Sequence, residues 1–121
     1  MIRSVPLLLL LAACAARSAE RDPLAGRTAG EPVECIDPTL NVTPQIVDAN
    51  TILFRETNRR VWRTGPRGAC PALRPLNTLI IQRYGTQLCR NDRFQVLQPG
   101  TTIPSGFCFF DRFTPYDLPR G

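Results

Sequence analysis

The sequence predicts an all-β fold: a small antiparallel β-sandwich or barrel-like domain held together by two disulfides. Beyond residue 33 the apolar runs are short, rich in Val, Ile, Thr and Phe, and separated by turn-forming residues, as in closely spaced strands. The 121-residue chain has 12 prolines, most of them between these runs, and proline interrupts helices. The same stretch holds four cysteines, and a domain of this size gains from covalent links because its core is small.

The N-terminus combines a basic start, an apolar run and a cysteine. Residues 1–13 are a predicted signal peptide, with a basic start and an apolar run too short to span a bilayer. The run ends in Leu-Ala-Ala-Cys at residues 11–14, which resembles the bacterial lipobox. The resemblance implies that Cys14 is the lipid-attachment residue and that cleavage precedes it. Because Ala15 and not Asp follows, Gram-negative sorting rules imply the outer membrane.

Residues 14–32 are predicted to be the lipidated cysteine and a flexible tether. Small, polar and charged side chains alternate there with glycine and proline, and almost nothing in this stretch could be buried. An extended tether would reach about 60 Å. We therefore expect the β domain, residues 33–121, to stand clear of the membrane.

Eight short segments are expected to be strands. Residues 48–50 (Asp-Ala-Asn) are a predicted turn between the second and third segments, and residues 56–59 (Glu-Thr-Asn-Arg) between the third and fourth. Strands joined by turns this short pair antiparallel. The eight segments are residues 33–36, 45–48, 51–55, 60–64, 78–83, 87–89, 94–97 and 107–110.

The cysteines of the predicted domain are Cys35, Cys70, Cys89 and Cys108. An even number in a small exported domain indicates disulfides, and four cysteines allow three pairings. We expect Cys70–Cys89, which closes a local loop. We also expect Cys35–Cys108, which joins the first and last predicted strands where the edges of the sheet meet. The main rival joins consecutive cysteines, Cys35 to Cys70 and Cys89 to Cys108.

Composition excludes most enzymatic chemistry. The chain has no histidine, and all 15 of its basic residues are arginine. It therefore lacks Ser-His and Cys-His nucleophilic pairs, histidine-ligated zinc, and a lysine for Schiff-base chemistry. Cys-x-x-Cys pairs and glycine-rich phosphate loops are also missing from the sequence. We expect a non-enzymatic protein with no metal site, no cofactor and no nucleic-acid partner.

One predicted hairpin carries a cluster of arginines: Arg55, Arg59, Arg60 and Arg63, with Trp62 among them. A basic surface that bears an aromatic ring suits an anionic partner such as lipopolysaccharide, phospholipid headgroups or an acidic protein surface. The more ordinary interpretation is a solvated sheet edge whose charges discourage aggregation, with Trp62 in the core. We favour this second interpretation and keep the first as the alternative.

Several short motifs accompany the four cysteines between residues 34 and 116. They are residues 35–36, 47–48, 51–54, 61–63, 70–73, 88–92, 108 and 112–115. In this order they resemble a widespread family of small proteobacterial exported proteins and lipoproteins that carries only an unknown-function label. The resemblance implies an envelope location and a fold of this type, and it implies no activity.

Together these features predict a cell-envelope lipoprotein, lipid-anchored in the outer membrane and facing the periplasm. We expect its domain to be a non-enzymatic binding or accessory module for an envelope protein or an anionic envelope component. The alternative is an inhibitor of a foreign hydrolase, lysozyme- or protease-inhibitor-like, that inserts residues 101–106 into an active-site cleft. The sequence leaves the ligand and the oligomeric state open.

The lipid anchor gives the first testable prediction. Because acylation needs the thiol of Cys14, Cys14→Ser should abolish incorporation of a palmitate analogue and release the protein from the membrane fraction. Metabolic labelling of wild type and variant measures this directly. An unlabelled wild-type protein, or a labelled variant, would contradict the lipoprotein assignment.

Overall fold

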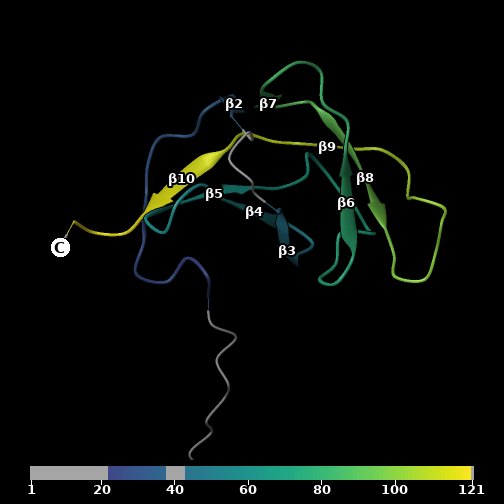
Figure 1. Ribbon diagram of the computed structural model, residues 1–121, viewed down its shortest axis with the longest axis horizontal. Helices are drawn as coiled ribbons and strands as arrows, with labels where there is room; N and C mark the ends of the chain where they lie inside the picture. The colour runs from purple at the N-terminus through teal and green to yellow at the C-terminus, as the bar shows by residue number, and fades with distance from the viewer. Residues whose placement is uncertain (1–21, 38–42, 121) are drawn as a thin grey trace, which may run out of the picture.

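The computed structural model describes residues 22–37 and 43–120, and it confirms an all-β domain of antiparallel strands with two disulfides (Figure 1). The predicted signal peptide, Cys14 and residues 15–21 lie outside the described residues. Within the described ranges, no helix is long and apolar enough to cross a membrane.

The largest sheet has five strands in the order β1-β10-β5-β4-β3. Side-chain oxygens hold both of its predicted hairpin turns. The Asp48 carboxylate accepts a 2.8 Å hydrogen bond from the Asn50 amide, and the Thr57 hydroxyl accepts 3.1 Å bonds from the amides of Arg59 and Arg60. The strands are β1 (Thr28–Ala29), β3 (Gln45–Asp48), β4 (Thr51–Arg55), β5 (Arg60–Thr64) and β10 (Thr114–Asp117).

Two smaller sheets complete the fold. A three-stranded sheet has the order β6-β8-β9, and β2 pairs with β7 in a short ladder. In Figure 1, β6 and β8 lie at a steep angle to β4 and β5 of the large sheet. Within β8, Phe94 and Val96 are buried while Arg93 points to the opposite, outer face. The strands are β2 (Cys35–Ile36), β6 (Thr78–Ile81), β7 (Leu88–Cys89), β8 (Arg93–Leu97) and β9 (Cys108–Phe109).

One core joins the large sheet to the three-stranded sheet. The ring of Phe110 lies 6.2 Å from that of Phe54 on β4 and 4.4 Å from that of Phe94 on β8. Phe113 lies 5.9 Å from Phe110 and 6.1 Å from Phe54. Aromatic pairs at these distances add about 0.5–1.5 kcal/mol each to the benefit of burial. Around the rings the core contains Ile36, Ile46, Ile52, Cys70, Leu73, Leu88 and Val96.

The C-terminal strand β10 was not predicted, because Pro115 cannot donate a ladder hydrogen bond. In the structure Pro115 stands opposite Trp62 of β5, and its carbonyl accepts a 2.8 Å bond from the Gly30 amide on the other side. The amide and carbonyl of one strand residue point toward the same neighbouring strand. The amide hydrogen that Pro115 lacks would therefore have pointed toward β1, and its absence leaves the pairing of β10 with β5 intact.

The predicted tether is too long, since the ordered domain begins before residue 33. Thr28 and Ala29 form β1 on β10, and Arg27 donates to the carbonyls of Asn58, Arg59 and Tyr116 at 2.8 to 3.4 Å. Further on, Val33 forms an isolated bridge with Phe113. Residues 27–32 have no apolar pattern, so these hydrogen bonds could not be predicted from the sequence.

The predicted disulfide pairing is wrong. The bridges are Cys35–Cys89, between opposite residues of β2 and β7, and Cys70–Cys108, with Cα atoms 6.0 Å apart. The expectation failed because Cys108 lies on β9, which is not the last strand and pairs with β8. The segment after Cys70 enters β6, which also pairs with β8 and not with the strand of Cys89. Neither the expected pairing nor its consecutive rival occurs.

Single cysteine variants should therefore fall into two matched pairs. On the chain-entropy model, loops of 54 and 38 residues make each bridge worth about 4 kcal/mol of unfolding free energy. In urea unfolding, Cys35→Ala and Cys89→Ala should lower the unfolding free energy by the same amount, and each should leave one free thiol. The same holds for the second pair, Cys70→Ala and Cys108→Ala. Peptide mapping under non-reducing conditions is the control, and a peptide linking Cys35 to Cys108 would contradict the structure.

Candidate functional site

The five residues of the predicted arginine patch do not form one surface. Arg60 and Trp62 point to one face of the large sheet, and Arg63 points to the other because strand side chains alternate. The register of β4 against β5 puts Arg55 on the same face as Arg63. Arg59 lies in the turn between these strands. The cluster seen in the sequence is thus divided between two faces and a turn.

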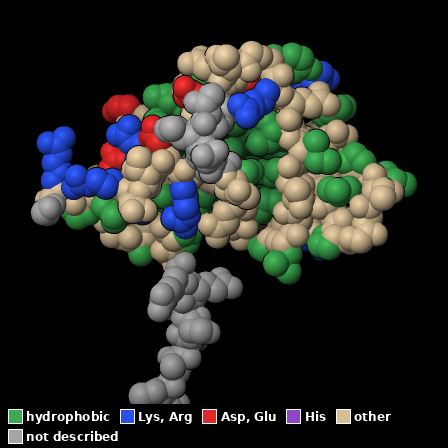
Figure 2. Space-filling view, in the orientation of Figure 1, with side chains coloured by type: hydrophobic (Ala, Val, Ile, Leu, Met, Phe, Trp, Pro, Cys, Tyr) green, Lys and Arg blue, Asp and Glu red, His purple; other side chains and the backbone are tan. Residues whose placement is uncertain are grey.

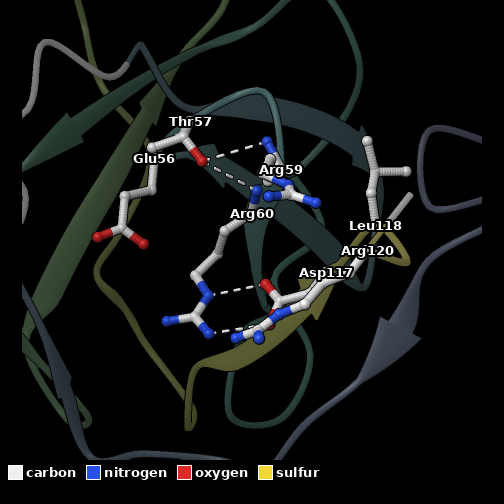
Figure 3. A pocket seen from close by; sticks show the side chains of 7 residues that line it. All are labelled: Glu56, Thr57, Arg59, Arg60, Asp117, Leu118 and Arg120. Atoms are coloured by element: carbon white, nitrogen blue, oxygen red, sulfur yellow. Dashed lines mark hydrogen bonds and ion pairs between the residues drawn. The ribbon is translucent and has the colours of Figure 1, made fainter.

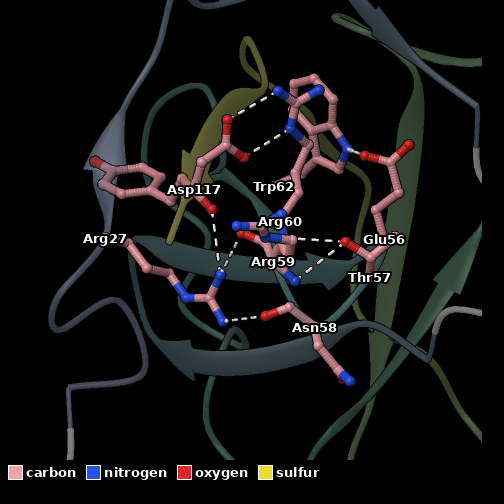
Figure 4. Close-up of polar contacts among 9 residues, drawn as sticks. Arg27, Glu56, Thr57, Asn58, Arg59, Arg60, Trp62 and Asp117 are labelled. Carbon is pink, nitrogen blue, oxygen red and sulfur yellow. Dashed lines mark hydrogen bonds and ion pairs between the residues drawn. The ribbon is translucent and has the colours of Figure 1, made fainter. Parts of the chain in front are cut away.

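Arg60 is neutralised by a carboxylate of its own chain (Figure 4). Its Nε and Nη2 donate to the two carboxylate oxygens of Asp117 at 2.7 and 2.8 Å. This bidentate bond raises the pKa of Arg60, and the same bond lowers the pKa of Asp117 below its ordinary value of 3.8. Both side chains are about two-fifths exposed, so solvent screens the pair.

Trp62 is held within the same network. Its Nε1 donates to the Glu56 carboxylate at 3.1 Å, and the Arg60 guanidinium carbon lies 5.3 Å from the ring centroid. The ring also packs against the core. The polar groups around Trp62 are therefore satisfied by one another, and its ring packs against the core as the ordinary interpretation expected. The expected sheet edge is wrong, because β5 lies between β10 and β4 inside the large sheet.

A shallow hollow of about 320 Å³ adjoins this ion pair (Figure 3). Among the described residues, no carboxylate lies within ion-pair distance of Arg59 or Arg120, both of which line it. The lining residues are Glu56, Thr57, Arg59, Arg60, Asp117, Leu118 and Arg120. Three arginines beside two carboxylates make this hollow only weakly cationic.

Two further features bear on chemistry: clusters of acidic or thiol side chains, and the Ser105 hydroxyl. No group of three or more Cys, Asp or Glu side chains that could hold a metal ion occurs in residues 22–37 and 43–120. Ser105, a hydroxyl that could in principle act as a nucleophile, is committed to structure. Its Oγ accepts from the Val96 amide at 2.9 Å and donates to the Gly106 carbonyl.

A different cluster lies on the outer face of the three-stranded sheet. The guanidinium carbon of Arg93 is 4.9 Å from the ring centroid of Phe107 and 5.9 Å from that of Tyr84. Arg93 also donates a hydrogen bond to the Tyr84 hydroxyl. Phe109 stands opposite Arg93 in the register of β8 and β9. We call Tyr84, Arg93, Phe107 and Phe109 the aromatic–arginine surface.

Exposed aromatic rings set this surface apart from the rest of the described domain. Tyr84 is 64% exposed, and Phe107 and Phe109 are more than two-fifths exposed, although aromatic rings are usually buried. In the described part of the chain, no carboxylate pairs with Arg93. Tyrosine and arginine are the residues that most often dominate binding energy at interfaces. The surface therefore has the composition of a binding site.

The segment that carries this surface is rich in arginine. Residues 66–110, which include β6 to β9, contain five arginines and one acid, Asp92. Of the five, Arg90 forms ion pairs with Glu34 and Asp111. The Asp92 carboxylate is occupied by the Cys89 amide at 2.7 Å. Acids and arginines are nearly balanced in the rest of the described chain. An anionic partner would consequently be drawn to this half of the domain.

Part of this surface could be predicted from the sequence. Alternation in residues 93–97 places Arg93 opposite the buried positions, and Phe107 and Phe109 share a face at a spacing of two. The contact between Tyr84 and Arg93 could not be predicted from the sequence, because it depends on how the chain returns from β6 to β8.

The loop predicted for an inhibitor, residues 101–106, has a fixed base and an exposed tip. The Ser105 amide donates to the Val96 carbonyl at 2.8 Å, and Gln95 Nε2 donates to the Ser105 carbonyl at 3.0 Å. Two residues beyond the base, Cys108 is bridged to Cys70. At the tip, Ile103 is 83% exposed. The loop therefore presents one apolar side chain on a well-anchored frame.

The Arg60–Asp117 pair predicts a specific pH dependence. Because folding lowers the pKa of Asp117, the pair stabilises the fold above the unfolded pKa of about 3.9 and loses this effect as pH falls through the lowered value. Asp117→Asn should therefore lower the urea midpoint at pH 7 and change it much less near pH 2. Glu31→Gln, which removes an exposed carboxylate outside the pair, is the control. Equal losses at both pH values would contradict the assignment.

Comparison with known proteins gives this chain no relative from which a role could be transferred. No family model, no curated protein and no solved structure matches it. The role of the domain must therefore be inferred from its own side chains, chiefly from the aromatic–arginine surface.

Proposed function

We propose that this chain is a cell-envelope lipoprotein, anchored through Cys14, whose domain is a non-enzymatic binding module. The partner we infer is an envelope protein that presents an acidic surface. The observation that carries the proposal is Arg93, a guanidinium held between two exposed aromatic rings with no carboxylate partner among the described residues.

Arg93 is prepared for a bidentate contact. One of its donors is occupied by the Tyr84 hydroxyl, and the rings of Tyr84 and Phe107 restrict the guanidinium. Restricting the side chain beforehand reduces the entropy lost when a carboxylate binds. Arginine presents its N–H groups in a planar fork that fits a carboxylate, and such charge-assisted bonds are about twice as strong as neutral ones.

The surrounding rings supply the rest of the recognition. Tyr84, Phe107 and Phe109 offer apolar contact area around the cation, and in an interface they would keep water away from the ion pair. The arginine excess of residues 66–110 would accelerate the encounter with an acidic partner and repel basic ones. A charged centre inside an aromatic rim favours a protein partner over a bare polyanion, which would not use the rings.

Replacing Arg93 tests the proposal. The envelope protein should be captured by the wild-type lipoprotein from detergent-solubilised envelopes, and Arg93→Gln should weaken that capture by about thirtyfold or more, as expected for a buried charge pair worth about 2–5 kcal/mol. Tyr84→Ala should weaken it less. The measurement is quantitative pull-down followed by titration of the captured partner.

Arg55→Gln is the matched control, since Arg55 is an exposed arginine on the large sheet. It should leave capture unchanged, and raised salt should reduce wild-type capture through slower association. If Arg93→Gln and Arg55→Gln capture the partner equally well, the aromatic–arginine surface is not the binding site.

The hydrolase-inhibitor function remains a second candidate because of Ile103. An apolar side chain that is 83% exposed on a loop with an anchored base is what a cleft-filling inhibitor needs. Purified protein should then inhibit a lysozyme or peptidase, with Ile103→Ala abolishing inhibition while Arg93→Gln does not. No inhibition across a panel of such enzymes would remove this candidate.

A further inference from the structure

The two most exposed large hydrophobic side chains of the described chain lie in neighbouring loops. Leu76 is 90% exposed and Ile103 is 83% exposed. Leu76 lies just before β6 and Ile103 lies in the loop after β8, and Thr78 and Leu97 stand opposite each other where those strands meet the loops. Both side chains are therefore at the same end of the three-stranded sheet.

These two loops face the same side as the start of the described chain. In Figure 1 the turn before β6 and the lower part of the loop after β8 reach the lower edge on the right, and the described N-terminal segment begins at the lower edge on the left. The space-filling view shows a hydrophobic side chain protruding from this edge below β6 (Figure 2). One edge of the domain thus combines apolar tips with the point at which the chain enters.

Chain length keeps this edge close to the predicted anchor. Cys14 and Asp22 are eight residues apart, so covalent geometry limits their separation to about 28 Å. A lipid on Cys14 would therefore hold the domain within that distance of the bilayer. Since the chain enters at the lower edge, an anchor at Cys14 would allow this edge to reach the membrane.

The loop of Leu76 is shaped so that the side chain projects. Leu76 has a φ of 74°, a left-handed conformation that L-residues with a Cβ rarely adopt. The Asn77 amide donates to the Arg74 carbonyl at 3.2 Å, and Asn77 Nδ2 donates to the Ala72 carbonyl at 2.8 Å. These bonds impose the turn. Core packing does not account for an unfavourable conformation at an exposed leucine, and such outliers often mark functional positions.

We propose that Leu76 and Ile103 insert into the interfacial region of a phospholipid bilayer, with Arg74 against the headgroup phosphates. Arg74 is exposed, two residues from Leu76, and without an ion pair among the described residues. Apolar tips flanked by arginine are suited to a bilayer interface, and a weak contact of this kind adds to a covalent anchor. The proposal rests on the lipid anchor at Cys14.

Docking through these two loops would determine where the aromatic–arginine surface lies relative to the membrane. Arg93 begins β8 and Leu97 ends it, so the aromatic–arginine surface lies toward the end of the strand away from the apolar loops. The membrane edge and the partner surface would then not compete for the same space.

Fluorescence quenching by brominated lipids tests the insertion. Lipidated full-length protein carrying Ile103→Trp is reconstituted into phosphatidylethanolamine–phosphatidylglycerol vesicles with bromine on the acyl chains near the headgroups. Its added fluorescence, relative to wild type with Trp62 alone, should fall roughly twofold against unbrominated vesicles. Tyr84→Trp, at the far end of the same sheet, is the matched control and should not be quenched. Adding Leu76→Asp should reduce the quenching of Ile103→Trp.

Vesicle flotation separates the possible failures. If the Ile103→Trp protein floats with the vesicles but is not quenched, the anchor stands and the insertion is wrong. If the protein carries no acyl label and does not float, the anchor proposed at Cys14 is wrong, and the insertion that rests on it is overturned. If Ile103→Trp responds to a lysozyme and not to brominated lipid, the loop is an inhibitory loop and the membrane inference is overturned.

Discussion

The packing of the Phe110 ring between two sheets is the interaction on which the rest of the domain depends. The ring is fully buried between Phe54 of the large sheet and Phe94 of the three-stranded sheet. Backbone bonds fix its position, since its amide donates to the Asp92 carbonyl at 3.0 Å and it forms an isolated bridge with Pro66. Because the chain passes from β9 through Phe110 to β10, this one residue holds the two sheets together both covalently and through packing.

The small core explains why the two disulfides lie where they do. Phe110 and its neighbours secure the centre, but β2 and β7 have only two residues each, and a ladder that short is marginal alone. Cys35–Cys89 crosslinks this ladder directly. Cys70–Cys108 ties the segment before β6 to β9, beside the two loops that carry Leu76 and Ile103. The bridges therefore stabilise the parts of the fold that burial cannot, and they hold the loops from which the proposed membrane contacts project.

Local chemistry made most of the strands predictable, and long-range pairing did not follow from it. The turns at Asp48 and Thr57 are set by their own side-chain oxygens, so the hairpins they close could be foreseen. Strand β10 was not predicted because Pro115 lacks a backbone N–H group. Whether this loss disrupts pairing depends on which neighbouring strand the position faces, and the sequence does not show that. The disulfides failed for the same reason, since spacing says nothing about β2 pairing with β7. The arginine patch failed because nearness in sequence does not distinguish the two faces of a strand.

The functional difference between Arg60 and Arg93 lies in what compensates each charge. Both guanidinium groups contact aromatic rings, at 5.3 Å for Arg60 and 4.9 Å for the nearer ring of Arg93. Arg60 has the Asp117 carboxylate, so a partner would have to displace that bond before gaining one of its own. Arg93 has only the Tyr84 hydroxyl, so a carboxylate from outside adds an ion pair without breaking one. Because β8 also carries Phe94 and Val96 into the core, a partner held at Arg93 would be rigidly connected to the loop beyond Leu97. On the proposed arrangement, the same strand would fix the height and orientation of that partner above the membrane.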